Sequence, residues 1–339
     1  MEVFQKTLST IENISFGPLP LSSGEIIEEV TLQYERVGPI DAPVILVCHA
    51  LTGNHITVGT HDSPGWWHGL IGQQKYIDTE KFQVITFNVL GGCDGSTGPS
   101  SINPETDEIY QTNFPSITIR DMVHAQYQAL KKLGIKNLAA IIGGSLGGMQ
   151  VLEWGILYPT AMEKSIVLAA TPFFSDYGIA FNHIALSAIK NDSVKGLELA
   201  RMIGMVTYRS SSLFTDRFNR EKTNSKYEVS SYLDYQGQKL AQRFDPTSYS
   251  YLLQAMNGHD IGEYRGGWQQ ASKEFKRPLL AISFENDLIY EPHHIRALTE
   301  FMPTSSYHHV QTNFGHDGFL TEFEKWGEIV QTFIEDPRA

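Results

Sequence analysis

Five short, almost entirely apolar runs restrict what this chain can fold into. They cover residues 44–48, 84–88, 138–142, 165–170 and 279–283. Runs this short and this apolar are typical of strands buried on both faces, as in a parallel sheet covered by helices. Several end at a small residue and are followed by helical periodicity. The alternation predicts an α/β fold with a mostly parallel, doubly wound sheet.

Other segments carry helix and strand signals. The sequence TIRD at 118–121 has the pattern of a capping box, so we expect a helix there that runs to about Leu133. The remaining expected elements are a half-exposed strand at 26–37, helices at 146–158 and 318–335, and a last strand at about 305–311.

The alternation stops between residues 172 and 274. That stretch is rich in Tyr, Ser, Gln, Met and Phe, and it has helical periodicity without a convincing buried strand. We therefore expect a helical insertion at 172–274, and a core domain formed by residues 1–171 together with 275–339.

Composition excludes several classes of function. Of 339 residues, 41% are hydrophobic, which is enough for a large buried core. The net charge is −12 and no cluster of Lys and Arg interrupts it, so we expect no nucleic-acid partner. Cys48 and Cys93 lack the spacing of a zinc site or a disulfide framework, so we expect no metal.

Targeting signals are also missing from the sequence. Residues 1–6 do not begin a secretion signal, and no apolar run approaches the length that spans a bilayer. We expect a cytoplasmic protein without a membrane partner.

The sequence Gly143-Gly144-Ser145-Leu146-Gly147 matches G-x-S-x-G. An expected buried strand precedes it and an expected helix follows it, which is the context of a nucleophile elbow. In such an elbow, small residues allow a sharp turn that exposes the serine hydroxyl. The alternative is a glycine-rich β–α turn in which Ser145 caps the helix.

A serine hydroxyl needs a base to act as a nucleophile, and the base needs an acid to orient it. In this fold the order along the chain is Ser, then Asp or Glu, then His. His316 lies in a glycine-flanked loop between the last expected strand and helix, so we expect it to be the base rather than a surface histidine. For the acid, Glu285 and Asp287 both follow the strand at 279–283, and we favour Asp287.

An oxyanion hole in this fold uses two backbone N–H groups. One belongs to the residue after the nucleophile, Leu146, and the other to the loop after the strand at 44–48. We expect Leu51 to supply the second donor and His49 to be a hydrogen-bonded structural residue.

Six stretches, taken together and in order, resemble the homoserine O-acetyltransferase family of α/β-hydrolase-fold acyltransferases. Two of them come from the expected insertion, which differs widely among hydrolase families. The stretches are HALTGNH (49–55), LGGCDGSTGPSSINP (90–104), GGSLGGMQVLEW (143–154), ARMIGMVTYRS (200–210), SYLDYQGQKL (231–240) and GHDGFL (315–320).

The resemblance implies an α/β-hydrolase fold with a helical lid, homodimerisation through that lid, and ping-pong transfer in methionine biosynthesis. Ser145 would take an acetyl group from acetyl-CoA, with Asp287 and His316 completing the triad, and the hydroxyl of L-homoserine would remove it. Acetyl-CoA is then a co-substrate, and no cofactor is implied.

The resemblance further implies that Arg201, Tyr208 and Asp317 contact the amino acid. A bidentate Arg suits a carboxylate and an Asp suits an ammonium group. The alternatives to substrate binding are structural roles. These are a salt bridge for Arg201, packing in the lid for Tyr208 and loop capping for Asp317.

Other activities remain open on the same triad. Relatives of this kind use succinyl-CoA or accept serine, and a serine hydrolase such as an esterase has the same three residues. A non-catalytic receptor on this fold is opposed by the intact set of Ser145, Asp287 and His316. The sequence departs from the family at Leu146, where Met is common, at Ser230, where Glu is frequent, and in a shortened stretch around 177–195.

Overall fold

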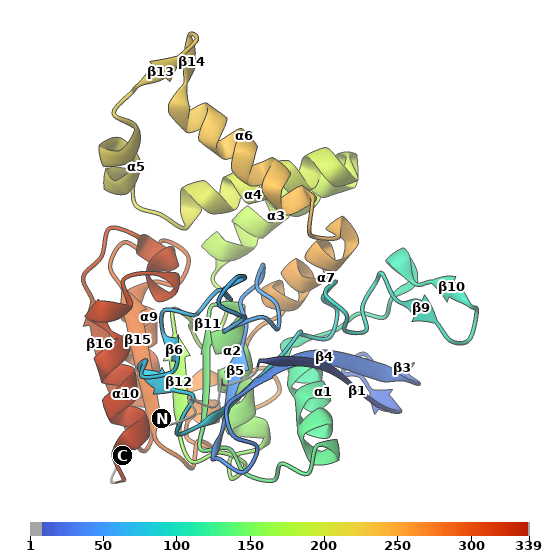
Figure 1. Cartoon of the computed structure of the whole chain (residues 1–339). Helices are drawn as coiled ribbons and strands as arrows, with labels where there is room; N and C mark the ends of the chain where they lie inside the picture. Colours follow the sequence, from blue (N-terminus) through green and yellow to red (C-terminus); the bar gives the residue numbers. More distant parts are fainter. Residues whose placement is uncertain (1–8, 338–339) are drawn as a thin grey trace, which may run out of the picture.

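A computed structural model describes residues 9–337, so the first residues, in which no secretion signal is expected, lie outside it. A central eight-stranded sheet organises the chain (Figure 1). Its first two pairs, β1–β4 and β4–β8, are antiparallel and the other pairs are parallel. In spatial order the strands are β1 Thr10–Phe16, β4 Val30–Val37, β8 Gln83–Phe87, β5 Val44–Cys48, β11 Ala140–Gly144, β12 Ser165–Leu168, β15 Leu279–Phe284 and β16 Ser305–Val310.

All five apolar runs fall in this sheet, as β5, β8, β11, β12 and β15, which confirms the predicted α/β class. Side chains along a strand alternate between the two faces of a sheet. In β5, Leu46 and Cys48 accordingly join one hydrophobic cluster while Ile45 and Val47 join another. The first cluster includes residues of α1 (Ile119–Lys132), α2 (Leu146–Leu157) and α9 (Pro292–Glu300), and the second includes residues of α10 (Gly327–Glu335).

Helix α1 begins as its sequence predicts. The Thr118 side chain accepts a hydrogen bond from the Asp121 amide, and Asp121 Oδ2 accepts one from the Thr118 amide at 2.8 Å. This capping box satisfies two N–H groups that a helix start leaves without partners. The helix ends at Lys132, and Gly134 takes the left-handed conformation (φ 78°) just beyond it.

The prediction of a single helix at 318–335 is wrong. The structure has two short 3-10 helices, Gly315–Leu320 and Phe323–Lys325, before α10 starts at Gly327. Glu322 breaks the continuity with a left-handed backbone (φ 47°). The break allows the Trp326 indole to be fully buried beside Trp67, where the ring centroids lie 6.5 Å apart.

Two elements, β3 Ile26–Ile27 and β4, replace the single strand expected at 26–37. The edge strand β1 was not predicted from the sequence. Short elements complete this part of the chain. They are β2 Leu19–Pro20, β6 Ile71–Gly72, β7 Ile77–Asp78, β9 Ile102–Asn103, β10 Glu108–Ile109 and a 3-10 helix at Gln111–Asn113.

Residues 172–274, here called the helical segment, leave the sheet after β12 and return to it at β15. Figure 1 shows α3, α4, α5 and α6 of this segment beyond one end of the sheet. The elements of the helical segment are α3 Asp176–Asn191, α4 Ser193–Thr207, α5 Ser211–Phe218, β13 Lys222–Thr223, β14 Lys226–Tyr227, α6 Glu228–Ala241, α7 Pro246–Asn257 and α8 Trp268–Ser272. That this segment is a domain separate from the core, with boundaries at residues 172 and 274, stays a prediction.

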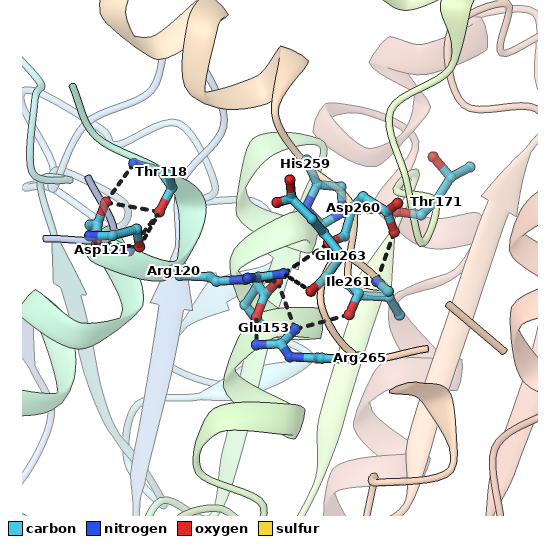
Figure 2. A network of polar contacts seen from close by, with 12 residues as sticks. Thr118, Arg120, Asp121, Glu153, Thr171, His259, Asp260, Ile261, Glu263 and Arg265 are labelled. Atoms are coloured by element: carbon cyan, nitrogen blue, oxygen red, sulfur yellow. Dashed lines mark hydrogen bonds and ion pairs between the residues drawn. The ribbon is translucent and has the colours of Figure 1, made fainter. Parts of the chain in front are cut away.

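A buried carboxylate fastens the end of the helical segment to the core (Figure 2). Glu153 of α2 accepts hydrogen bonds from Arg120 Nε of α1 at 3.1 Å and from Arg265 Nη2 at 2.8 Å. Arg120 also donates to the carbonyls of Asp260 and Glu263. Because the Glu153 carboxylate binds both arginines and Arg120 also donates to carbonyls of the loop at 260–265, this loop is held against α1 and α2. Among residues 9–337, no helix has the length and hydropathy needed to cross a bilayer.

Candidate active site

Ser145 stands at the sharp turn between β11 and α2. Its backbone has φ 56° and ψ −125°, a conformation that L-residues rarely adopt and that marks functional sites when it is found. The turn needs small neighbours. A Cβ on Gly147 would lie 2.0 Å from the carbonyl oxygen of Cys48, and a Cβ on Gly143 would lie 2.4 Å from that of Gly147. The backbone is therefore that of a nucleophile elbow, and Ser145 forms no side-chain cap on α2.

His316 and Asp287 are brought together from two loops at the same edge of the sheet. His316 Nδ1 lies 2.8 Å from Asp287 Oδ2, and the side chains are 5% and 0% exposed. The other oxygen, Asp287 Oδ1, accepts hydrogen bonds from the amides of Ile289 and Tyr290, each at 2.9 Å. Asp287 thus fixes the orientation of the imidazole and leaves Nε2 as the nitrogen free for chemistry.

Glu285, the alternative acid, points elsewhere. Its carboxylate accepts from Gln311 and lies 2.7 Å from His309 Nε2 near the surface. That pairing lowers the pKa of Glu285. Of the two carboxylates that the sequence left open, the structure places only Asp287 against His316.

Tyr290 is a site residue that the sequence reasoning missed. Ser145 Oγ donates to its hydroxyl at 3.5 Å, and its ring is stacked on that of His316 with centroids 5.0 Å apart and an angle of 22°. Burial raises the pKa of the Tyr290 phenol. An aromatic residue three positions after a candidate acid was the only signal available, and it does not by itself indicate a site.

The two expected amide donors follow the carboxyl ends of two neighbouring parallel strands, β5 and β11. Leu146 is the first residue of α2, so its N–H has no partner within the helix. Leu51 lies in the loop after β5, and that loop packs against α2 where Gly147 meets Cys48. The amide of Leu51 donates to no other residue in the described chain. Neither N–H group is used by another hydrogen bond within residues 9–337, and their role as oxyanion donors stays a prediction.

His49 has a structural position, as expected. Its Nε2 accepts from the amide of Val89 at 3.0 Å, and its Nδ1 lies 2.8 Å from the carbonyl of Ala50. Burial lowers the pKa of His49 to about 4, so the ring is neutral at pH 7. Its hydrogen bonds hold the loop that carries Leu51.

A cavity of about 30 Å³ joins Ser145 and His316 to the helical segment. Residues of α3, α4 and α7 line it together with Phe174 and Tyr290. No Lys, Arg, Asp or Glu is among the residues that line it in the described chain. Apart from His316, the residues that line the cavity next to the serine are therefore apolar or uncharged polar residues.

Two of the three residues expected to contact an amino acid lie next to His316, and the third, Arg201, lies near Tyr208. The Tyr208 ring lies 5.4 Å from that of His316, between centroids, and Asp317 follows His316 in the chain. Arg201, on α4, is half-buried and close enough for its charge to lower the pKa of Tyr208, although burial raises that pKa overall. Within residues 9–337 the Arg201 guanidinium forms no hydrogen bond or ion pair.

Asp317 already has a partner, Arg209, which the sequence analysis did not single out. Arg209 Nε donates to Asp317 Oδ2 at 2.7 Å, and its Nη1 donates to the hydroxyl of Tyr232 at 2.7 Å. Arg209 directly follows Tyr208 in the stretch ARMIGMVTYRS, so it was within a stretch already noted. Oδ1 of Asp317 is the oxygen left for a ligand.

Two further groups bear on metal and thiol chemistry. Glu291, His293 and His294 place ligand atoms within 4.8 Å of one another at the start of α9, near the surface, although the sequence predicted no metal. Cys93 is partly buried, and burial raises its pKa to about 11. A thiol with that pKa is a poor nucleophile at pH 7.

Comparison with known proteins agrees with this geometry. The family described as alpha/beta hydrolase fold matches residues 43–323. Homoserine O-acetyltransferase of Carboxydothermus hydrogenoformans is 40% identical, over 96% of this chain and 94% of its own length. The homonymous protein of Symbiobacterium thermophilum is also 40% identical, over 95% and 93%.

Solved structures give the same result. Homoserine O-acetyltransferase from Staphylococcus aureus superposes with a TM-score of 0.86 at 36% identity, covering 97% of this chain and 96% of that one. Esterase E22 superposes with a TM-score of 0.89 at 24% identity, covering 97% and 100%, which shows a shared fold. The chain therefore belongs to the homoserine O-acetyltransferase family and is an acyltransferase built on the α/β-hydrolase fold.

Proposed function

We propose that this protein transfers an acetyl group from acetyl-CoA to the hydroxyl of L-homoserine through an acetyl-Ser145 intermediate, as a step of methionine biosynthesis. The observation that carries the proposal is the buried pair of His316 and Asp287, 2.8 Å apart, with His316 lining the same cavity as a serine on a strained elbow.

The first half-reaction acylates Ser145. His316 takes the Ser145 proton, Oγ attacks the thioester carbon, and the amides of Leu51 and Leu146 bind the oxyanion. The C–S bond breaks, and His316 gives its proton to the departing CoA thiolate. Asp287 keeps the imidazole oriented and stabilises its cationic form.

The second half-reaction moves the acetyl group to the acceptor. His316 takes the proton of the homoserine hydroxyl, whose oxygen attacks the acyl carbon, and Ser145 Oγ leaves and regains a proton from His316. The free guanidinium of Arg201 suits the acceptor carboxylate, Asp317 suits the ammonium group, and Tyr208 lies beside the base.

Acetyl is favoured over succinyl as the transferred group by the relatives of this chain. The proteins of Carboxydothermus hydrogenoformans and Symbiobacterium thermophilum, each 40% identical, are both named homoserine O-acetyltransferase.

A homodimer through the helical segment accompanies this function. Apolar side chains on α3, α4 and α6 are exposed, including Ile184 at 52%, Leu199 at 50%, Val206 at 49% and Tyr235 at 57%. These helices contact one another, and apolar side chains exposed on neighbouring helices are typical of an interface between subunits. The helical segment is thus proposed both to cover the active site and to bind the helical segment of a second copy of the chain.

Intact-mass analysis tests the function directly. The protein is incubated with acetyl-CoA or succinyl-CoA, with and without homoserine. We expect one acetyl group on the protein, its removal by homoserine with formation of O-acetylhomoserine, and no adduct on Ser145→Ala. An adduct that survives in Ser145→Ala contradicts the acyl-serine. Hydrolysis of acetyl-CoA as fast without homoserine as with it indicates an esterase instead.

A further inference from the structure

Tyr290 contacts all three proposed catalytic side chains. Its hydroxyl accepts from Ser145 Oγ at 3.5 Å, its ring is stacked on His316, and its backbone amide donates to Asp287 Oδ1 at 2.9 Å. The side chain is 1% exposed. Asp287 therefore holds the base with one oxygen and the segment carrying Tyr290 with the other, which fixes the phenol relative to both nucleophile and base.

Of the hydroxyl protons of Ser145 and Tyr290, one has an acceptor in the described chain and the other has none. In the resting arrangement Ser145 is the donor and the Tyr290 oxygen is the acceptor. The phenolic proton itself has no acceptor in the described chain. Burial raises the pKa of Tyr290, so this proton stays on the phenol at working pH. A donor without an acceptor thus lies next to the nucleophile.

We propose that Tyr290 is a further catalytic residue, whose hydroxyl donates a hydrogen bond to Ser145 Oγ whenever that oxygen has lost its proton. The assignment rests on the proposed acyl-serine mechanism. In acylation the serine proton passes to His316, so Oγ becomes an acceptor and the phenol rotates its proton toward it. In the acetyl-enzyme Oγ is an ester oxygen and again has no proton to give.

The contribution is largest when Oγ carries charge. As the second tetrahedral intermediate collapses, the bond between the acyl carbon and Oγ breaks and its electron pair stays on Oγ. The phenol stabilises that charge until His316 returns its proton to Oγ, and Tyr290 keeps its own proton throughout. A donor group held next to developing charge needs little reorganisation during the reaction, and such stabilisation is among the stronger catalytic effects.

Tyr290→Phe tests the proposal because it removes the hydroxyl and keeps the ring that stacks on His316. Rapid-quench mass analysis follows acetylation by acetyl-CoA and deacetylation by homoserine in single turnovers. We expect each rate constant to fall about 10- to 100-fold, as for loss of one donor to a developing oxyanion. The KM for homoserine should stay within about twofold, since the hydroxyl acts on Oγ and not on the acceptor.

The matched control is Tyr158→Phe. Tyr158 lies at the far end of α2 from Ser145, and its hydroxyl is bonded to His124 at 2.7 Å. Both rates should stay at the wild-type value in this variant. If the wild-type enzyme is acetylated and Tyr290→Phe reacts at wild-type rates, only the proposed role of Tyr290 is overturned. No acetyl-enzyme in the wild type overturns the acyl-serine proposal, and this assignment with it.

A second probe covers the case in which Tyr290→Phe does not fold. Incorporation of 3,5-difluorotyrosine at position 290 keeps the shape of the side chain and lowers the pKa of the phenol. An ionised phenol cannot donate, so we expect the alkaline limb of the kcat profile to move to lower pH. An unchanged limb contradicts a donating role.

Discussion

Arg209 of the helical segment is ion-paired with Asp317, the residue that follows His316. Nε and Oδ2 lie 2.7 Å apart, and the side chains are only 18% and 11% exposed. Around this pair, the Asp317 amide donates to the carbonyl of Tyr208, and the Ser210 hydroxyl donates to that of Asn313. The segment that carries Tyr208 and the loop that carries the base are therefore joined at three points.

Loss of one partner of this pair should destabilise the protein. Arg209→Ala leaves a largely buried carboxylate without its cation, so we expect the free energy of unfolding in urea to fall by about 2–4 kcal/mol. A double-mutant cycle with Asp317→Ala should show coupling of about 1 kcal/mol or more. Lys226→Ala is the control, because its pair with Asp234 is 54% and 46% exposed and should contribute about 0.2–1 kcal/mol. Additive losses from Arg209→Ala and Asp317→Ala contradict this prediction.

Asp287 and His316 should act as one unit with Ser145. Asp287→Ala and His316→Ala should each lower kcat by about 10⁴-fold or more, and the double variant should be little worse than the worse single one. Steady-state kinetics checks this. Glu285→Gln should keep wild-type kcat, because Glu285 is paired with His309 away from the site. A large loss in Glu285→Gln would assign the acid to Glu285.

Arg201 should affect the acceptor and not the donor. Arg201→Ala should still be acetylated by acetyl-CoA at a near-normal rate, whereas kcat/KM for homoserine should fall by an amount equal to about 2–5 kcal/mol. Arg201→Lys should recover little of it, since an ammonium group lacks the bidentate geometry. Lys195→Ala, on the exposed part of the same helix, is the control. Impaired acetylation with an unchanged KM for homoserine contradicts the acceptor assignment.

Protonation of His49 should weaken the fold in mild acid. Its pKa is about 4 in the folded protein and about 6.5 in the unfolded chain, so only the unfolded chain binds the proton between these values. The free energy of unfolding should therefore decrease as pH falls from about 6.5 to 4, with His49 contributing about 3 kcal/mol to the decrease. His49→Gln should reduce this slope in urea titrations, whereas His61→Gln, at a side chain 98% exposed, should not. Equal slopes in all three proteins would exclude His49 as the cause.

The exposed apolar face of the helical segment should hold two copies together. Light scattering at micromolar concentration should give a dimer for the wild type and a monomer for the double variant Val206→Glu and Tyr235→Glu, because charge in an apolar interface is costly. Tyr264→Glu is the control, since Tyr264 is 93% exposed but lies outside α3, α4 and α6. A wild-type monomer contradicts the proposed dimer.

The sequence predicted the buried strands and the turn at Ser145, because both depend on residues that are close together in the chain. Continuous apolar runs are typical of strands buried on both faces, and the five runs of this chain correspond to five of the eight strands. Small residues around Ser145 are required by the close approach of Gly147 to Cys48, so the elbow was visible as a motif. His316 could be proposed as the base because few positions satisfy both the order of the residues and the need for a loop, and the structure places it against Asp287.

Contacts between distant segments could not be predicted in the same way. Tyr290 and Arg209 acquire their positions only when the sheet and the helical segment meet, and neither belongs to a pattern that announces chemistry. The edge strand β1 is exposed along most of its length, so it lacks the apolar run that identified the others. The broken helix at 315–335 was missed because burial of Trp326 outweighs the helical periodicity of the surrounding residues.

The position of the helical segment between β12 and β15 has a consequence for synthesis on the ribosome. Ser145 and its elbow emerge early, but Asp287 and His316 follow the entire helical segment. Until β15 and β16 are made, β12 is the open edge of the sheet, and such an edge can pair with other chains. At about 5–20 residues per second, the nascent protein spends several seconds or more in this state. The chain is therefore inactive, and exposed to chaperones and to aggregation, until its last strands join the sheet.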